Sequence, residues 1–178
     1  MKAKSSLNIA LTAVFAAIYS IGVVFLAPIS FQIFQVRVAD ALLPLAMLFG
    51  WPAVLGLSLG AFVANIFGGL GPIDMVGGAV ANFIATFVAW RIANNRGRRW
   101  ALVGVVSEVI IVTLVVGSYL SYLLAVPLEI SWLGVFLGSI TAIGVLGSIL
   151  FFALSTDRIS TTLRTYGLGI YNSQSEKK

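Results

Sequence analysis

The chain has 178 residues, of which 60% are hydrophobic and 10% are charged, and its mean hydropathy is +1.05. These values exclude an ordinary soluble domain and predict an all-α integral membrane protein. Because cysteine and histidine are both absent, we expect no disulfide, no metal site, no cofactor and no thiolate or imidazole catalysis. The net charge of +5 lies in short clusters beside apolar runs, which is typical of membrane orientation rather than nucleic-acid binding.

Six apolar runs predict six transmembrane helices, since about 20 helical residues cross a bilayer. All belong to one domain, residues 1–178, which ends in a polar cytoplasmic tail at 157–178. The predicted helices cover residues 6–27, 36–49, 52–67, 73–90, 100–126 and 131–155. No small-residue cleavage site follows the first run, so it is interpreted as a helix and not as a signal peptide.

The break at Phe49-Gly50-Trp51-Pro52 divides residues 36–67 into two short helices, because glycine and proline interrupt helices. With this break, every basic cluster falls on one side of the membrane, as the positive-inside rule requires. These clusters are Lys2 and Lys4, the loop Arg91–Arg99, and the tail from Arg158 to Lys178. We therefore expect both termini in the cytoplasm and a multi-pass location in the cell membrane.

Charged residues inside apolar runs mark candidate functional positions, since each costs about 2.5–3.5 kcal/mol at mid-membrane. Arg37 and Asp40 are three residues apart on one helical face near its outer end. They form either a structural ion pair at the rim or part of a binding site. Asp74 follows a glycine-rich turn at the start of a helix, where it either caps the helix or faces a ligand.

Glu108 lies about eight residues inside its predicted helix, where snorkelling does not relieve its charge. Either it pairs with a neighbour such as Asn82 or a threonine, or it is a protonated acid. Glu129 and Trp132 together suit an interfacial anchor, and Trp132 is also a candidate for ligand contact.

Neutral polar residues add to these candidates. The amides of Asn65 and Asn82 suit either a ligand's polar edge or hydrogen bonding between helices. Tyr119 and Tyr122 lie near an outer helix end, where they form an aromatic belt or a stacking platform.

The first helix carries small residues at spacings of three and four, which permit another helix to approach closely. They are Ala10, Ala13, Ala17 and Ser20. Such a face packs either within its own bundle or against a partner.

Four segments together resemble the QueT family of substrate-binding S components of energy-coupling factor (ECF) transporters. They are LNIALTAVFAAIYSIGVVFLAPISF, QVRVADAL, FVANIFGGLGPIDMVGGAVAN and GSYLSYLLAVPLEISW. The resemblance implies a six-helix S component, with both termini inside, that binds a micronutrient from outside. It further implies a shared module of one transmembrane coupling subunit and two ABC ATPases, which docks on Ala13 and Ala17. The chain itself has no nucleotide-binding loop of the Walker A type.

For the ligand, the resemblance implies a queuosine precursor, a 7-deazaguanine such as 7-aminomethyl-7-deazaguanine or queuine. We assign its recognition to Asp74 and Glu108 with Asn65 or Asn82. The family pattern implies Gly-Glu where this chain has Gly138-Ser139, and no charge at position 108. Either the acid stands on a facing helix or the substrate differs. The alternatives are an S component for another vitamin-like micronutrient, a membrane scaffold without transport activity, and a stand-alone channel or facilitator.

Overall fold

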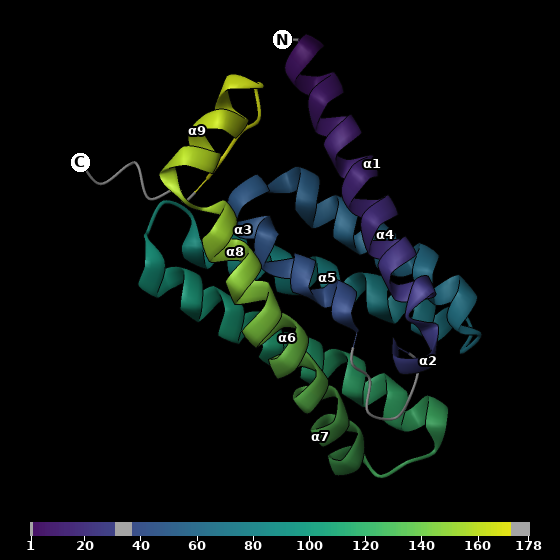
Figure 1. Ribbon diagram of the computed structural model, residues 1–178. Coiled ribbons are helices and arrows are strands. Elements are labelled where there is room, and N and C mark those ends of the chain that lie inside the picture. The colour runs from purple at the N-terminus through teal and green to yellow at the C-terminus, as the bar shows by residue number, and fades with distance from the viewer. Residues whose placement is uncertain (1, 31–36, 172–178) are drawn as a thin grey trace.

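The structure, a computed structural model, describes residues 2–30 and 37–171, and helices make up nearly all of that part of the chain (Figure 1). The elements are α1 (Lys2–Phe25), α2 (Ala27–Ser30), the 3₁₀ helix η1 (Val38–Leu45), α3 (Ala46–Phe49), α4 (Trp51–Gly68), α5 (Pro72–Ala93), α6 (Arg98–Leu124), α7 (Leu128–Ser139), the π-helix η2 (Ile140–Gly147), α8 (Ser148–Leu154) and α9 (Asp157–Thr165). The prediction of an all-α membrane protein is confirmed.

Five helices in the described residues are long and apolar enough to cross a membrane. They coincide with five of the six predicted spans, and α7, η2 and α8 together form the last of these as one continuous rod. The helical ends differ from the predicted ends by only a few residues. Membrane-crossing length is thus well predicted by counting apolar residues, because the hydrocarbon thickness sets that length.

The remaining predicted span, 36–49, is a shorter helix made of η1 and α3, Val38–Phe49. Eight residues at the ~2.0 Å rise of a 3₁₀ helix and four at the ~1.5 Å rise of an α-helix give roughly 22 Å. Every residue from Leu43 to Gly50 is buried, so this helix is enclosed by the others and does not face lipid along that part. A buried helix needs no full bilayer length, which explains its shortness.

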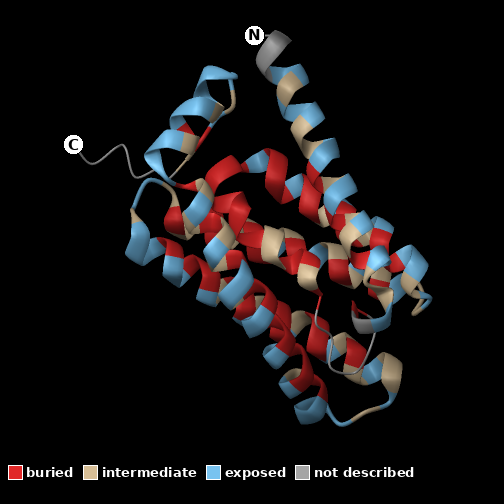
Figure 2. Cartoon of the chain, in the orientation of Figure 1, coloured by how far each residue is buried: buried red, intermediate tan, exposed pale blue. Residues whose placement is uncertain are grey.

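The long helices enclose this central segment, as Figure 2 shows by the buried residues gathered in the middle of the bundle. The first helix lies at the edge and is held closely to α4 through two glycines. A Cβ atom on Gly56 or Gly60 would meet backbone atoms of Thr12 or Ala16 at 2.6 and 2.9 Å. These glycines let the two helices approach until their backbones touch.

The π-helix η2 packs against the 3₁₀ helix η1 of the central segment. Gly147, the last residue of η2, packs on η1 so closely that a Cβ atom there would lie 2.8 Å from Pro44. The narrow 3₁₀ winding of η1 and the wide π winding of η2 therefore lie against each other. Departures of this kind from regular helix geometry occur often at functional sites.

The predicted break at Gly50 is present, with φ of +62° and ψ of −137°, a conformation that only glycine adopts easily. The C-terminal segment covers this turn. The amide of Tyr171 donates a hydrogen bond to the Leu48 carbonyl at 2.8 Å, and its ring packs edge-on against Trp90 at 5.6 Å. Part of the predicted polar tail thus folds back over the end of the bundle, as α9 and the C-terminal strap, residues 166–171. The composition of the tail did not indicate this structure.

Replacement of Gly50 by alanine is expected to destabilise the protein by about 1–3 kcal/mol, because it places a side chain in a glycine-only conformation. The new Cβ atom would also meet the Tyr171 ring at 2.7 Å. Thermal unfolding of the purified protein in detergent measures the effect. The control is Gly144→Ala, where the nearest atom lies 3.9 Å away. Equal melting temperatures for both variants would contradict the strain at Gly50.

Candidate functional site

Buried polar side chains from five parts of the chain lie inside the bundle, mostly in the half opposite the arginine-rich loop, whereas Asn82 lies at the middle of α5 and Glu108 in the half of α6 that begins at Arg98. Each is at most 5% exposed except Tyr119, which is half-buried. They are Tyr19 of α1, Arg37 and Asp40 at the start of η1, Asn65 of α4, Asp74 and Asn82 of α5, and Glu108 and Tyr119 of α6. All but Tyr19 were predicted as site residues from the sequence.

Asp74 is the most connected member of this group. Arg37 Nη2 lies 3.7 Å from Asp74 Oδ1, and the Tyr119 hydroxyl donates a hydrogen bond to the same oxygen at 3.0 Å. Asn65 Nδ2 donates to the Asp74 main-chain carbonyl at 2.7 Å. Asp74 lies in the first turn of α5, where a carboxylate is favoured by the helix dipole, but the N-cap residue is Gly71 and no side chain forms a capping hydrogen bond there.

Arg37 and Asp40 attract each other electrostatically, in agreement with their spacing, but each also contacts a residue of another helix. Arg37 forms an ion pair with Asp74, and Asp40 accepts a hydrogen bond from the Tyr19 hydroxyl at 2.5 Å. Both residues are 5% exposed, so they lie inside the bundle and not at its rim. The spacing along one helix does not reveal these contacts with side chains of other helices.

Two adjacent glycines of α5 make room for the partners of Asp74. A Cβ atom on Gly77 would lie 2.9 Å from the Tyr119 ring, and one on Gly78 would collide with the Asn65 amide. Tyr119 therefore lies flat along α5 and directs its hydroxyl to Asp74. Because the Tyr119 ring packs on α5, it is not positioned as the predicted stacking platform for a ligand. The Gly77-Gly78 pair is a sequence signal for this packing that was not used in the prediction.

A small cavity of about 10 Å³ lies among these residues, which is close to the space that one water molecule occupies. Its polar lining comes from Arg37, Asp40, Asn82 and Ser139, and its apolar lining is Val112, Val116 and Val135. Ser139, the position where the family pattern implies an acid, was not predicted as a site residue. A ligand as large as a bicyclic base must displace side chains here in order to bind.

Glu108 lies one helical turn before Val112 and is 0% exposed. Neither of its carboxyl oxygens has a hydrogen-bond partner among the described residues. Its expected partner Asn82 donates to the Leu57 carbonyl at 3.3 Å. The alternative of a threonine on a neighbouring helix is not supported either, because Thr86 of α5 donates to the Asn82 carbonyl at 2.6 Å and not to Glu108.

Trp132 does not join the polar group. Its indole packs over Gly117, where a Cβ atom would lie 2.5 Å from Cδ1, and its N–H donates to Ser118 Oγ at 3.1 Å. It does not line the cavity. Tyr122 is 77% exposed and Glu129 is exposed too, so the interfacial interpretation suits these three residues better than ligand contact.

The small-residue face of α1 divides between the two sides of the helix. Ala10, Ala13 and Ala17 are exposed, in accordance with a surface that another helix can reach. Ser20 points into the bundle, where its hydroxyl lies 3.0 Å from the Gly60 carbonyl and donates to it. The predicted four-residue face is therefore corrected to the three alanines.

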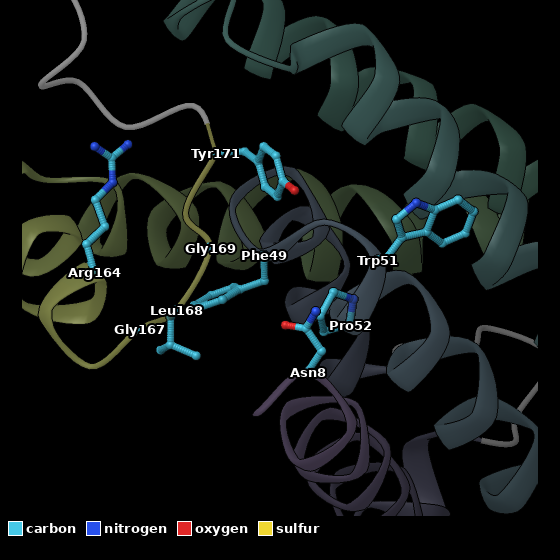
Figure 3. Close-up of a pocket in the computed structure, with 9 residues that line it drawn as sticks. All are labelled: Asn8, Phe49, Trp51, Pro52, Arg164, Gly167, Leu168, Gly169 and Tyr171. Atoms are coloured by element: carbon cyan, nitrogen blue, oxygen red, sulfur yellow. The ribbon is translucent and has the colours of Figure 1, made fainter. Parts of the chain in front are cut away.

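A larger hollow of about 450 Å³ lies at the opposite end of the bundle (Figure 3). The C-terminal strap, the start of α1 and the turn after Phe49 form its wall. It is lined by Asn8, Phe49, Trp51, Pro52, Arg164, Gly167, Leu168, Gly169 and Tyr171. None of the predicted site residues lies there and the lining contains no carboxylate, so the polar group around Asp74 is the stronger candidate site.

Loss of the Tyr119 hydroxyl is expected to destabilise the bundle by about 1–2 kcal/mol, because a hydrogen bond to a buried carboxylate disappears. The variant is Tyr119→Phe, and thermal unfolding in detergent is the measurement. Tyr122→Phe serves as a matched control, since that side chain is exposed near the same end of α6. If both variants melt at the wild-type temperature, the Tyr119–Asp74 bond does not stabilise the fold.

Comparison with protein-family models finds one that matches, described as QueT transporter, over residues 9–156. Comparison with curated proteins and with solved structures finds no match. The matched range runs from the first helix to the end of α8 and includes every residue of the buried polar group. A transporter family agrees with helices that are long and apolar enough to cross a membrane several times. This chain belongs to the QueT transporter family.

Proposed function

We propose that the chain is the substrate-binding S component of an ECF-type importer and that it takes up a 7-deazaguanine precursor of queuosine. The observation that carries this proposal is the buried polar group around the small cavity, enclosed by apolar helices. Polar groups are costly inside a membrane protein unless they bind something. Membership in a transporter family makes a transported solute the natural partner.

The atoms at this site match the edge of a 7-deazaguanine. The ring N–H and the exocyclic amino group are adjacent donors, which a carboxylate accepts in pairs. Asp74 Oδ2 is buried without a hydrogen-bond partner among the described residues, and Asp40 lines the cavity. The base carbonyl is an acceptor, for which Arg37 and Asn82 supply cavity-lining donors. Asn65 contributes an acceptor, because its amide nitrogen already binds the Asp74 carbonyl while Oδ1 is unpaired there.

The orientation follows from charge. Four arginines gather where α5 ends and α6 begins, and two more belong to α9. They are Arg91 in the last turn of α5, Arg96 in the connection, Arg98 and Arg99 at the start of α6, and Arg158 and Arg164 of α9. The positive-inside rule puts this side in the cytoplasm together with both termini, which requires Val38–Phe49 to traverse the bundle as a sixth, enclosed helix. All members of the polar group except Asn82 and Glu108 then lie in the outer half, where a receptor for an external solute needs them.

Energy for uptake would come from partner subunits, namely one transmembrane coupling subunit and two ABC ATPases. The exposed alanines of α1 support docking of a helix from the coupling subunit, because small side chains let backbones approach closely. Ala10, Ala13 and Ala17 form the surface that we assign to this contact.

The ligand assignment is tested by calorimetric titration of the purified protein with 7-aminomethyl-7-deazaguanine, queuine, guanine and a panel of vitamins. We expect one of the two 7-deazaguanines to bind most tightly. Tight binding of a vitamin instead would indicate an S component with another substrate. A lack of binding by every compound would favour a scaffold protein and overturn the receptor proposal.

Asp74→Asn is expected to weaken binding of the preferred 7-deazaguanine at least tenfold, about 1.4 kcal/mol. The variant removes the charge that holds Arg37 and that accepts the base donors. Glu129→Gln is the control, because Glu129 is exposed at the start of α7. Unchanged affinity in Asp74→Asn would remove this carboxylate from the binding site.

The double variant Ala13→Leu/Ala17→Leu should abolish co-purification with the coupling module while ligand affinity stays at the wild-type value. Leucine at these exposed positions blocks close helix contact without touching the polar group. Val103→Leu/Val106→Leu enlarges two exposed side chains of α6 and serves as the control. Intact co-purification of the alanine double variant would place the docking surface elsewhere.

A further inference from the structure

Glu108 is the one acid of the site that nothing in the described structure satisfies. It is fully buried in α6, and both carboxyl oxygens lack a hydrogen-bond partner among the described residues. An ionised carboxylate without a partner is strongly unfavourable in apolar surroundings, whereas a neutral carboxyl group is tolerated there. The side chain therefore calls for either a proton or a cation.

The charged groups on the surrounding helices supply no such cation near Glu108. The helix α5 carries Asp74 at its start and Arg91 at its end, and η1 carries Asp40 just after Arg37. Neither η2 nor α8 contains a charged residue, and α7 has only the exposed Glu129 at its far end. On α6 itself, Arg98 and Arg99 stand more than two turns before Glu108, and Tyr119 lies about three turns after it.

Asp40 interacts electrostatically with Glu108 as a like charge, so the two carboxylates repel each other when both are ionised. The site then holds Asp40, Asp74 and Glu108 against the single cation Arg37, a net charge of −2 from three negative groups and one positive group. A proton on Glu108 removes one of these charges. A ligand that carries one positive charge can take the place of that proton.

The position of Glu108 suits a side group that extends beyond the base. Val112 lines the cavity and follows Glu108 by one helical turn, a rise of about 5.4 Å. Asp40 lines the same cavity and is within electrostatic reach of Glu108. A substituent that extends from the base past Val112 would therefore approach Glu108 while it stays near Asp40.

We propose that this site selects a ligand carrying a protonated amine, and that Glu108 exchanges its carboxyl proton for an ion pair with that amine. This inference rests on the proposed function and specifies its substrate class: 7-deazaguanines with an ammonium group are preferred to neutral ones. The carboxyl O–H bond of Glu108 breaks, its proton leaves to solvent, and the carboxylate accepts a hydrogen bond from the ligand's N–H. No bond of the ligand is made or broken.

The test compares 7-aminomethyl-7-deazaguanine with the uncharged 7-cyano-7-deazaguanine in calorimetric titrations of the full-length protein. At pH 7, the titrations are run in phosphate and in Tris, which differ in their heat of protonation. The difference between the two binding heats gives the number of protons released when the ligand binds. We expect release of about one proton with the aminomethyl compound and none with the cyano compound. The affinity for the amine should also rise with pH, while that for the nitrile stays level.

Glu108→Gln is the matching variant, because glutamine keeps the shape and removes the titrating proton. It should bind the aminomethyl compound at least tenfold more weakly, bind the cyano compound as the wild type does, and release no proton. Glu129→Gln should behave as the wild type in all three respects. The proton count on the wild-type protein is decisive even where the Glu108 variant does not fold.

Two outcomes would overturn the inference separately from the proposed function. If both 7-deazaguanines bind with equal affinity and without proton release, the receptor assignment stands and the role of Glu108 is wrong. If neither 7-deazaguanine binds, the proposed substrate is wrong, and titration with two other protonated amines, pyridoxamine and spermidine, tests the role of Glu108. Binding of one of these cations with proton release supports the amine selectivity, and failure of both removes it.

Discussion

The buried contact between Arg37 and Asp74 connects more of this structure than any other polar interaction. Arg37 stands at the entry to the enclosed helix η1, whereas Asp74 belongs to the first turn of α5. Tyr119 extends the contact to α6, and Asn65 extends it to α4. Breaking one partner away would leave a charge without compensation in an apolar interior, which costs several kcal/mol. The contact therefore fixes the relative positions of four helical segments around the cavity.

Glycine placement is the condition that lets this polar group form. Gly77 and Gly78 admit the Tyr119 ring and the Asn65 amide to the surface of α5, and Gly147 admits η1 to η2. In each case a single methyl group would meet another atom within the van der Waals distance. The bundle therefore depends on close helix contacts at these glycines, which a larger residue would disrupt.

The parts of the fold that depend on local chemistry could be predicted from the sequence. Helix lengths follow from apolar runs, and the turn at Gly50 follows from adjacent glycine and proline. The partners of the buried charges could not be predicted in the same way. Arg37 and Asp40 share a helical face, yet each bonds to a residue from another helix. Tyr19 and Ser139 were missed because a tyrosine or serine in an apolar helix looks like packing until its neighbours are known.

The irregular winding of η1 was also beyond sequence reasoning. Residues 38–49 read as a short α-helical span, and nothing in their composition separates a 3₁₀ helix from an α-helix. In the folded protein η1 packs closely against η2, where a Cβ atom on Gly147 would lie 2.8 Å from Pro44. Part of the C-terminal tail is ordered for a related reason, since the packing of Tyr171 on Trp90 depends on the Gly50 turn being present.

The hydrogen bond between Tyr19 and Asp40 connects α1 to the wall of the small cavity. Ala17 points outward and Tyr19 points inward, only two residues apart on one stiff helix. The same helix therefore carries both the exposed alanines and the tyrosine that bonds to Asp40 at the cavity wall. A displacement of α1 would carry the Tyr19 hydroxyl with it and so change the cavity wall at Asp40.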